Sequence, residues 1–506
     1  MQTLARLGPA IFLVQLLGFG SSVALATQLG ATTQTDAYFL ALTVPFFTYS
    51  ILLSAVRQGA VPSLTVVAHG EPRESFTTAC RQFVSGTVAT AALLSLCVTA
   101  AMLLLLPIVA GANHHLVDLA RQYMIELSPY AVTGGALGAL GAILAVKRSF
   151  VIPALMLGCE PLLKCALVLL FPGLGAQALV IASVAGNLIA ALVLWVLVVR
   201  RGIPLRFVRF HSSPLLRTIV TLTIPLAVGQ SVLQFNPLID RTLAAGLGTG
   251  NVTAFDIGAR LFTAPANILG TILTAPLTAT WSARLATEGW VAVTRSFRRV
   301  ASAAVMIAAP LTVIGFLLRR DLVGLIYSSH AYNTTAVART GDVFGLLLIG
   351  LLAQILVTPL STLFLVRGAN VFQMKMAFLN AALNTLLDLL LRGPLGVGGI
   401  AFSTTLTYII VCLAYFREAH RRWSLDLRSL IRPIAVSGGS CVLILASCGA
   451  IFGLSDFRSS RFEELAVVAA IVGIAAAIHG SLMLGGRVFT AIGPVLKSDQ
   501  GFSTDN

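Results

Sequence analysis

The sequence predicts an all-α integral membrane protein, and three observations support this fold class. Apolar residues make up 57% of the 506 residues, charged residues make up 10%, and the mean hydropathy is +0.91. A soluble protein needs more charged side chains to cover its surface. The apolar residues form continuous runs rather than an alternating pattern. This pattern excludes a β-barrel and favours helices, the other structure that satisfies every backbone group in lipid.

About fourteen runs are long enough to cross a bilayer, whose apolar core needs about 20 residues in helical form. The predicted spans are 7–29, 37–63, 83–110, 124–146, 150–171, 174–199, 216–243, 252–282, 298–318, 342–366, 371–392, 395–415, 431–453 and 463–485. Together they take up almost the whole chain. The sequence therefore leaves almost no room for a soluble domain.

The net charge of +15 indicates the orientation of the chain in the membrane. With the N-terminus inside, the segments assigned to the cytoplasm hold 23 Lys and Arg residues, and the segments on the opposite side hold 7. This asymmetry follows the positive-inside rule and places both termini in the cytoplasm. Arg319 and Arg320 are the main exceptions. Because orientation explains the basic charge, we expect no nucleic-acid partner.

The two halves of the chain resemble each other in short motifs. The residues from Ala24 to Gly30 resemble those from Thr242 to Gly248 at an offset of 218, and Asp36 with Pro45 resembles Asp256 with Pro265 at an offset of 220. Repeated bundles are typical of transporters. The predicted parts are an N-lobe of six helices (1–200), a cytoplasmic linker (201–215), a C-lobe of six helices (216–416), two further helices (417–490) and a cytoplasmic tail (491–506).

Ionisable residues inside the spans indicate where a function lies, because each costs at least about 2.5–3.5 kcal/mol on insertion scales. Arg260 is the deepest single arginine, and its guanidinium can bind a phosphate of an anionic substrate through two hydrogen bonds. The alternative is an ion pair with Asp256, four residues earlier on the same helix. Both arrangements can occur in alternate states of a gate. Glu160 and Lys164 have the same spacing, and we expect them to neutralise each other.

A second set of polar residues predicts a cation site. Asp240, Asn384 and Asp388 carry side-chain oxygens inside predicted spans, and Thr404 lies at a depth similar to that of Asn384. A main-chain carbonyl near Ile400 completes a set of oxygen ligands that suits a hard cation such as Na⁺. We expect no other cofactor, because the seven cysteines lack metal-binding spacing.

The same residues leave two alternatives open. A proton can take the place of Na⁺, or the carboxylates can form simple ion pairs, Asp240 with Arg241 or Arg260 and Asp388 with Arg392. The sequence also argues against an enzyme, because a membrane glycosyltransferase needs a carboxylate-bearing outer loop or a cytoplasmic domain. The only candidate loop, 319–342, has one acid between its ends. A cation-coupled small-molecule antiporter and a scaffold without transport are the remaining alternatives.

Several motifs along the chain together resemble one known family. The motifs are Leu17-Gly18-Phe19, Thr35-Asp36-Ala37-Tyr38-Phe39 with Pro45, Asp240-Arg241 through Gly248, Ala259-Arg260-Leu261 with Pro265 and Gly270, Asn384-x-x-x-Asp388, and Gly398-Gly399-Ile400-Ala401. They resemble the MurJ-type lipid II flippases, the mouse virulence factor family of the multidrug/oligosaccharidyl-lipid/polysaccharide exporter superfamily. The resemblance spans the chain.

The resemblance implies a two-lobed, fourteen-helix carrier in the inner membrane of a bacterium. It implies that a monomer moves an undecaprenyl-pyrophosphate-linked sugar to the outer leaflet, with that glycan and membrane lipids as its partners. The residues that it assigns to the substrate cavity are Asp36 and Arg260. Helical spacing adds Asp256 as the gating partner of Arg260. The residues that the resemblance assigns to a Na⁺ site are Asp240, Asn384, Asp388, Ile400 and Thr404. The last two helices match a pair that forms a lipid-tail groove.

The chain departs from the family at three cationic positions. The family usually has arginines before and after the Leu-Gly-Phe motif, where this chain has Gln15 and Ser21, and again near Tyr49 and Ser50 in the second span. Fewer cations predict a weaker hold on a pyrophosphate. A lipid-linked unit for exopolysaccharide or O-antigen export is therefore an alternative to lipid II.

Overall fold

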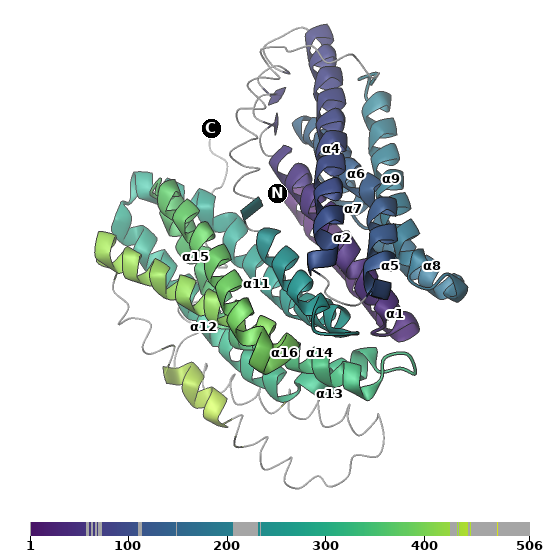
Figure 1. Cartoon of the computed structure of the whole chain (residues 1–506). Helices are drawn as coiled ribbons and strands as arrows, with labels where there is room; N and C mark the ends of the chain where they lie inside the picture. The colour runs from purple at the N-terminus through teal and green to yellow at the C-terminus, as the bar shows by residue number, and fades with distance from the viewer. Residues whose placement is uncertain are drawn as a thin grey trace. The chain divides into compact units, whose positions relative to one another are not determined.

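The computed structural model consists of helices and their connections, with no strand among the residues that it describes (Figure 1). These residues are 2–56, 60–61, 64–65, 68, 73–109, 114–147, 149–205, 231–232, 234–425, 433, 435–443, 446 and 473. Much of the predicted spans 216–243 and 431–453, nearly all of 463–485, most of the linker and the whole tail lie outside them. The count of fourteen spans therefore stays a prediction.

Packing divides the chain into two compact units. The first unit contains Met1–Ile257 and Tyr327–Ala336, and the second contains Gly258–Ile326 and Val337–Asn506. This division records which residues pack together. The predicted lobe boundaries near residues 200 and 416 concern the internal repeat, and they stay a prediction.

The first unit is a bundle of apolar helices. Its elements are α1 (Gln2–Leu29), α2 (Thr33–Ile51), the π-helical turn η1 (Leu52–Val56), α4 (Arg73–Val109), α5 (His114–Glu126), α6 (Ser128–Val146), α7 (Val151–Met156), α8 (Cys159–Leu170), the 3₁₀ turn η2 (Pro172–Leu174), α9 (Gln177–Arg200) and the start of α11 (Asn251–Thr287). The closest packing joins α8 to α9, α4 to α6, and α2 to α5. In Figure 1, α4, α6 and α9 run side by side.

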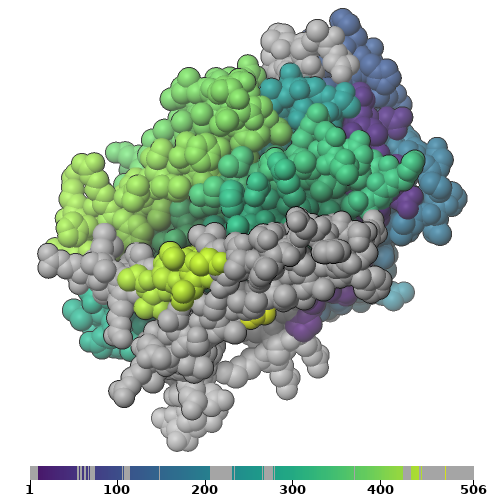
Figure 2. All heavy atoms as spheres, turned by 90° about the horizontal axis from the view of Figure 1, so that it is seen from below, coloured from purple at the N-terminus to yellow at the C-terminus, as the bar shows by residue number. Residues whose placement is uncertain are grey.

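Among the described residues, the second unit contains the rest of α11, a helical stretch over residues 435–443 and five helices that Figure 1 labels. They are α12 (Trp290–Leu317), α13 (Arg319–Tyr327), α14 (Thr334–Ile349), α15 (Leu351–Val366) and α16 (Asn370–Trp423), of which α13 and α14 each have one end in the first unit. Within this unit α15 packs against both α12 and α16. Figure 2 shows side chains of these helices, coloured teal to light green, packed closely over part of the face in view.

The described helices confirm an all-α membrane protein. Seven helical stretches are long and apolar enough to cross a membrane, or eight if the bent pair of α14 and α15 forms one span. The stretch Val371–Trp423 contains two predicted spans, which are separated at Gly396, where the backbone leaves the helical region. Large apolar side chains such as Leu96, Leu104 and Leu170 are exposed on the helices, as lipid-facing residues must be.

Two predicted spans are interrupted at matching places. The span 124–146 breaks at Leu127, between α5 and α6, and the span 342–366 breaks at Gly350, where α14 and α15 meet at a bend of 43°. The separation of Leu127 and Gly350 along the chain is close to the offsets that the sequence motifs show. Such paired interruptions fit an internal repeat of the kind that transporters use.

The close approach of α8 and α9 depends on a glycine. A Cβ atom at Gly186 of α9 would lie 2.5 Å from the Cα atom of Glu160 of α8, which is closer than real atoms approach. Because Gly186 has no side chain, α8 can approach α9 closely. Glu160 of α8 therefore lies beside Asn187, the residue that follows Gly186 on α9. This contact places a carboxylate inside the bundle.

Candidate functional site

The N-terminus of α11 is bound by an acid from α2. Thr35, Asp36, Gly250 and Thr253, which we call the α2–α11 junction, lie within the first unit. Oδ1 of Asp36 accepts hydrogen bonds from the main-chain N (2.8 Å) and the hydroxyl (2.6 Å) of Thr253, and Oδ2 accepts one from the main-chain N of Gly250. Asp36 is only 1% exposed. The carboxylate thus satisfies N–H groups that a helix start leaves without an intrahelical partner.

The junction joins equivalent residues of the predicted repeat. Helices α2 and α11 begin at Thr33 and Asn251, and the hydroxyl oxygens of Thr35 and Thr253 are 3.0 Å apart. Each of these two pairs has the offset of 218 that the sequence motifs show. Contact between equivalent residues is what a two-fold relation between two bundles produces. Gly250, with φ of +85°, supplies a turn conformation that other residues rarely adopt.

An ion pair lies further along α11 and joins it to the helix over residues 234–245. Arg241 and Asp256 form a salt bridge, and Nη1 of Arg241 also donates a hydrogen bond to the hydroxyl of Thr43 on α2 (3.4 Å). Asp256 is buried, whereas Arg260, one turn later on α11, is exposed. The spacing of four residues predicted an ion pair between Asp256 and Arg260. The structure shows a salt bridge between Asp256 and Arg241, which precedes α11 in the sequence.

A polar network surrounds Glu160 within the first unit. Its carboxylate forms the predicted ion pair with Lys164 of the same helix, which confirms that prediction. Tyr130 of α6 and Asn187 of α9 each donate a hydrogen bond to Oε2 of Glu160, at 3.1 and 2.8 Å. Asn187 in turn accepts a hydrogen bond from the Tyr49 hydroxyl (3.1 Å). Four helices therefore contribute to one hydrogen-bonded network around a buried ion pair.

The second unit holds a carboxylate cluster of a different kind. Asp388 is fully buried and accepts hydrogen bonds from the side-chain amide of Asn384 (2.9 Å) and from the hydroxyl of Ser403. The main-chain carbonyl of Ile400 accepts from the hydroxyls of Ser403 (2.7 Å) and Thr404 (3.2 Å). We call these five residues the Asp388 cluster. It brings carboxylate, amide, hydroxyl and carbonyl oxygens together within α16.

The structure brings together four of the five residues predicted for a Na⁺ site. Asn384, Asp388, Ile400 and Thr404 lie in the Asp388 cluster, and Asp240 is buried in the first unit. Oxygen ligands of these types fit the chemistry of a hard cation. Sequence analysis did not predict Ser403. The only sequence feature that pointed to it is its position next to the predicted ligand Thr404.

Arg319 and Arg320 share one acid in the second unit. Nε of Arg319 lies 3.2 Å from Oδ1 of Asp342, and Nη2 of Arg320 lies 2.7 Å from its Oδ2. The hydrogen bond and the negative charge of Asp342 raise the pKa of Arg320 above its usual value. Arg319 and Arg320, the main exceptions to the positive-inside pattern, are therefore partly neutralised by Asp342.

Comparison with known proteins identifies the relatives of this chain. A family model described as "Lipid II flippase MurJ" matches residues 25–473. A Rhizobium tropici protein described as "Probable lipid II flippase MurJ" is 25% identical over 268 residues, which are 52% of this chain and 48% of that protein. A protein of Treponema pallidum with the same description is 22% identical over 216 residues, which are 43% of this chain and 41% of that protein. The matches span about half the length of these relatives.

Solved structures show the same fold. A lipid II flippase MurJ in an inward closed conformation superposes with a TM-score of 0.77 at 16% identity, covering 95% of this chain and 99% of that chain. An inward-facing multidrug resistance MATE family transporter superposes with a TM-score of 0.68 at 16% identity, covering 83% of this chain and 98% of that chain. The family model covers most of the sequence, and the described helices have the matching architecture. The chain therefore belongs to the lipid II flippase MurJ family.

Proposed function

We propose that this protein is a flippase that moves a polyprenyl-pyrophosphate-linked oligosaccharide across the plasma membrane of a bacterium by alternating access. Family membership supports the substrate class, and the membrane-spanning helices support the location. The proposal describes a multi-pass transporter rather than an enzyme. It works as a monomer with both termini in the cytoplasm, as the distribution of Lys and Arg indicates.

The observation that carries this proposal is the exposure of Arg260. This arginine lies nine residues from the start of α11, or about 13 Å along the helix axis, which is close to the middle of an apolar core of about 30 Å. An exposed guanidinium at this depth needs a watery or anionic environment, because hydrocarbon solvates it poorly. Its planar donors suit a phosphate oxygen pair. Arg260 is therefore the proposed receptor for the pyrophosphate.

Asp36 and Asp256 complete the proposed substrate set as gating residues. In this structure Asp36 binds the start of α11 and Asp256 pairs with Arg241, so both acids hold α2 or the helix over residues 234–245 against α11. We propose that these contacts break when the α2–α11 junction opens. The release of Asp256 from Arg241 would change the charge beside Arg260, four residues away on the same helix. This change would couple substrate release to closure.

The range of glycans that this protein could carry depends on the neutral residues at the family's cationic positions. Ser21 donates a hydrogen bond to the carbonyl of Gly18, and Tyr49 donates one to Asn187, so these side chains are engaged within the protein. With fewer cations the cavity holds a pyrophosphate less tightly than the family pattern would. Lipid II and a lipid-linked unit for exopolysaccharide or O-antigen are therefore the two glycans to compare. A small-molecule antiporter is the alternative that requires no role for Arg260.

The test of this proposal is translocation in cells depleted of the protein. Cells are complemented with wild type, Arg260→Ala, Arg260→Lys or the control Arg284→Ala, which changes an arginine near the end of α11. We expect Arg260→Ala to lower translocation of the labelled precursor about tenfold, the effect of losing one charge-assisted contact of about 1.5 kcal/mol, and Arg260→Lys to lower it less. The precursor that accumulates inside identifies the glycan. Full translocation by Arg260→Ala would reject the role of Arg260.

We further propose that Na⁺ binds at the Asp388 cluster and couples transport to the ion gradient. The fifth predicted ligand, Asp240, belongs to the first unit, and its part in the site stays a prediction. The buried oxygens of Asn384, Asp388, Thr404 and the Ile400 carbonyl support this proposal. A proton at Asp388 is the alternative. The oxygens of these residues would bind the ion, and the positive charge of the ion would stabilise the ionised carboxylate of Asp388.

Thermal unfolding in detergent tests the ion. We expect NaCl, compared with choline chloride at equal ionic strength, to raise the Tm of wild type and of the control Glu418→Gln on α16. Asp388→Asn removes the charge and should abolish this shift while leaving the Tm in choline chloride within a few degrees of wild type. A shift that survives in Asp388→Asn would reject the Na⁺ site. A shift with pH alone would favour the proton.

A further inference from the structure

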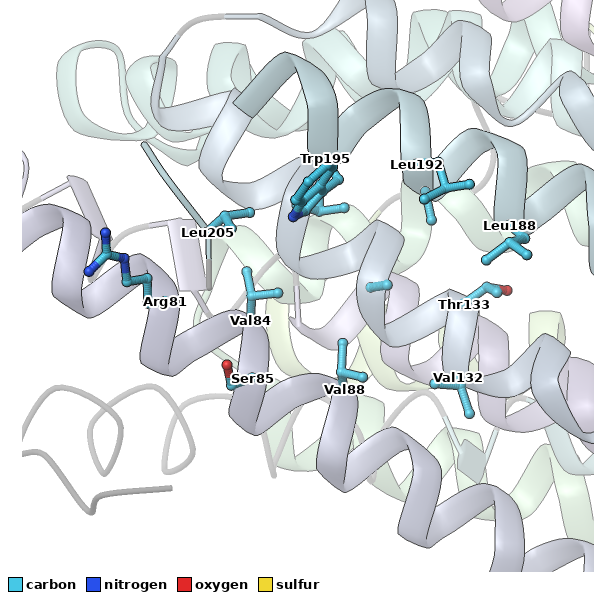
Figure 3. Close-up of a pocket in the computed structure, with 13 residues that line it drawn as sticks. Arg81, Val84, Ser85, Val88, Val132, Thr133, Leu188, Leu192, Trp195 and Leu205 are labelled. Carbon is cyan, nitrogen blue, oxygen red and sulfur yellow. The ribbon is translucent and has the colours of Figure 1, made fainter. Parts of the chain in front are cut away.

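An apolar cavity of about 400 Å³ lies within the first unit, between α4, α6 and α9. We call it the α4–α9 slot and define it by Arg81, Val88, Ala136, Leu188, Ala191 and Trp195. Figure 3 shows Arg81 and Leu205 at one end of the slot and Leu188 and Thr133 at the other. Every lining residue belongs to the first unit. The slot therefore does not depend on the arrangement of the two units.

The slot runs along two candidate membrane-spanning helices, α4 and α9. Arg81 and Val88 are seven residues apart on α4, and Trp195 and Leu188 are seven residues apart on α9, so each wall is about 10 Å long. Half of the apolar core of a bilayer is about 15 Å. Arg81 lies near the start of α4, and Trp195 lies near the end of α9. Under the sidedness proposed above, both of these ends face the cytoplasm.

The walls of the slot suit an acyl chain. Leu188 and Leu192 are 49% and 53% exposed along α9, whereas Ala191 and Thr133 are buried at the slot. The hydroxyl of Thr133 donates a hydrogen bond to the carbonyl of Tyr130 on the same helix, so this polar group is already satisfied within α6. Large side chains at the edge and small ones at the floor form a narrow apolar channel. A sugar or a charged solute would find few polar partners there.

The cytoplasmic end of the slot is basic. Nε of Arg81 donates to the carbonyl of Pro204 (2.6 Å), which fixes the plane of its guanidinium. Lys147 follows the end of α6, and Arg200 and Arg201 lie at the end of α9. A guanidinium binds a phosphate through paired donors, and Trp195 has the amphipathic ring that is typical of the membrane interface. This end therefore complements an anionic head group.

We propose that the α4–α9 slot binds one anionic phospholipid of the cytoplasmic leaflet, with an acyl chain between α4 and α9 and the phosphate on Arg81. Because one unit forms the whole site, the lipid stays bound while the units rearrange, and it stabilises the first unit. This role is separate from that of the carried substrate, whose proposed receptor Arg260 belongs to the second unit.

Native mass spectrometry of the detergent-purified protein tests the proposal. The protein is titrated with phosphatidylglycerol, or in parallel with phosphatidylethanolamine, and the Kd of the first bound lipid is measured. We expect wild type to prefer phosphatidylglycerol. Arg81→Gln should weaken its binding about tenfold and remove the preference, because one charge-assisted contact is lost. Ala191→Phe fills the slot and should weaken the binding of both lipids.

Two control variants show whether the effects are local. Arg121→Gln removes an exposed cation from α5 of the same unit without changing a lining residue, and Leu104→Phe enlarges an exposed side chain elsewhere on α4. Both should bind phosphatidylglycerol as wild type does. Wild-type affinity in Arg81→Gln, which changes a partly exposed residue and should fold normally, would overturn the proposal. Tighter binding of a polyprenyl phosphate, lost in Ala191→Phe, would overturn it in favour of a substrate-tail groove.

Discussion

The Glu160 network of the first unit and the Asp388 cluster of the second share a general plan but differ in the polar partner of the acid. Each places a carboxylate, partly buried at Glu160 and fully buried at Asp388, beside a polar partner four residues away on the same helix. The partners are Lys164 for Glu160 and Asn384 for Asp388. Each also has a donor from the next span, Asn187 in the first unit and Ser403 in the second. The shared plan places two acids inside the membrane at a cost that their neighbours offset.

Some residues of the two sites occupy equivalent positions of the internal repeat. Lys164 and Asn384 are separated by the same offset as Asp36 and Asp256, and so are Ser183 and Ser403. The first unit has a covalently attached ammonium at the position where the second unit has an amide. A fixed cation neutralises an acid permanently, whereas an amide leaves room for a cation that can exchange. The difference supports a structural role for the Glu160 network and is consistent with the ion site that we propose at the Asp388 cluster.

Removal of the fixed cation should have the largest effect. Lys164→Met leaves Glu160 in the bundle without its ion-pair partner, and we expect it to lower the free energy of unfolding by about 3–5 kcal/mol. Titration of detergent-solubilised protein with sodium dodecyl sulfate measures this loss. The double variant Glu160→Gln, Lys164→Met should recover most of it. A Lys164→Met protein as stable as wild type would show that the ion pair contributes nothing to stability.

The α2–α11 junction should give a smaller loss. Asp36→Ala leaves the main-chain N–H groups of Gly250 and Thr253 without their acceptor, and we expect a cost of about 2 kcal/mol in the free energy of unfolding. Asp118→Ala, which changes an exposed acid on α5, is the control and should be neutral within about 0.5 kcal/mol. If the two variants were equally stable, the junction would not hold the helix starts together.

Some of these contacts were within reach of sequence analysis, and others were not. The pairing of Glu160 with Lys164 follows from helical spacing, because residues four apart lie on one face. The donors to Asp36 belong to a distant part of the chain, and the partner of Asp256, Arg241, lies across a turn. Periodicity describes one helix at a time, so it cannot find contacts between helices. The repeat offset was the usable signal, since it relates Ser183 to Ser403.

The two equivalent serines provide the finest test of the comparison. Ser183→Ala removes a hydroxyl 2.9 Å from that of Tyr38, and Ser403→Ala removes the hydroxyl that donates to Asp388. Each should cost about 1 kcal/mol in the free energy of unfolding, the usual value of one buried hydrogen bond. Only Ser403→Ala should also change the Na⁺ concentration that gives half of the thermal shift, by a few fold, because only that serine contacts the proposed ion ligand. Equal Na⁺ midpoints in both variants would place the ion elsewhere, whereas a change in Ser183→Ala would contradict the structural role of the first network.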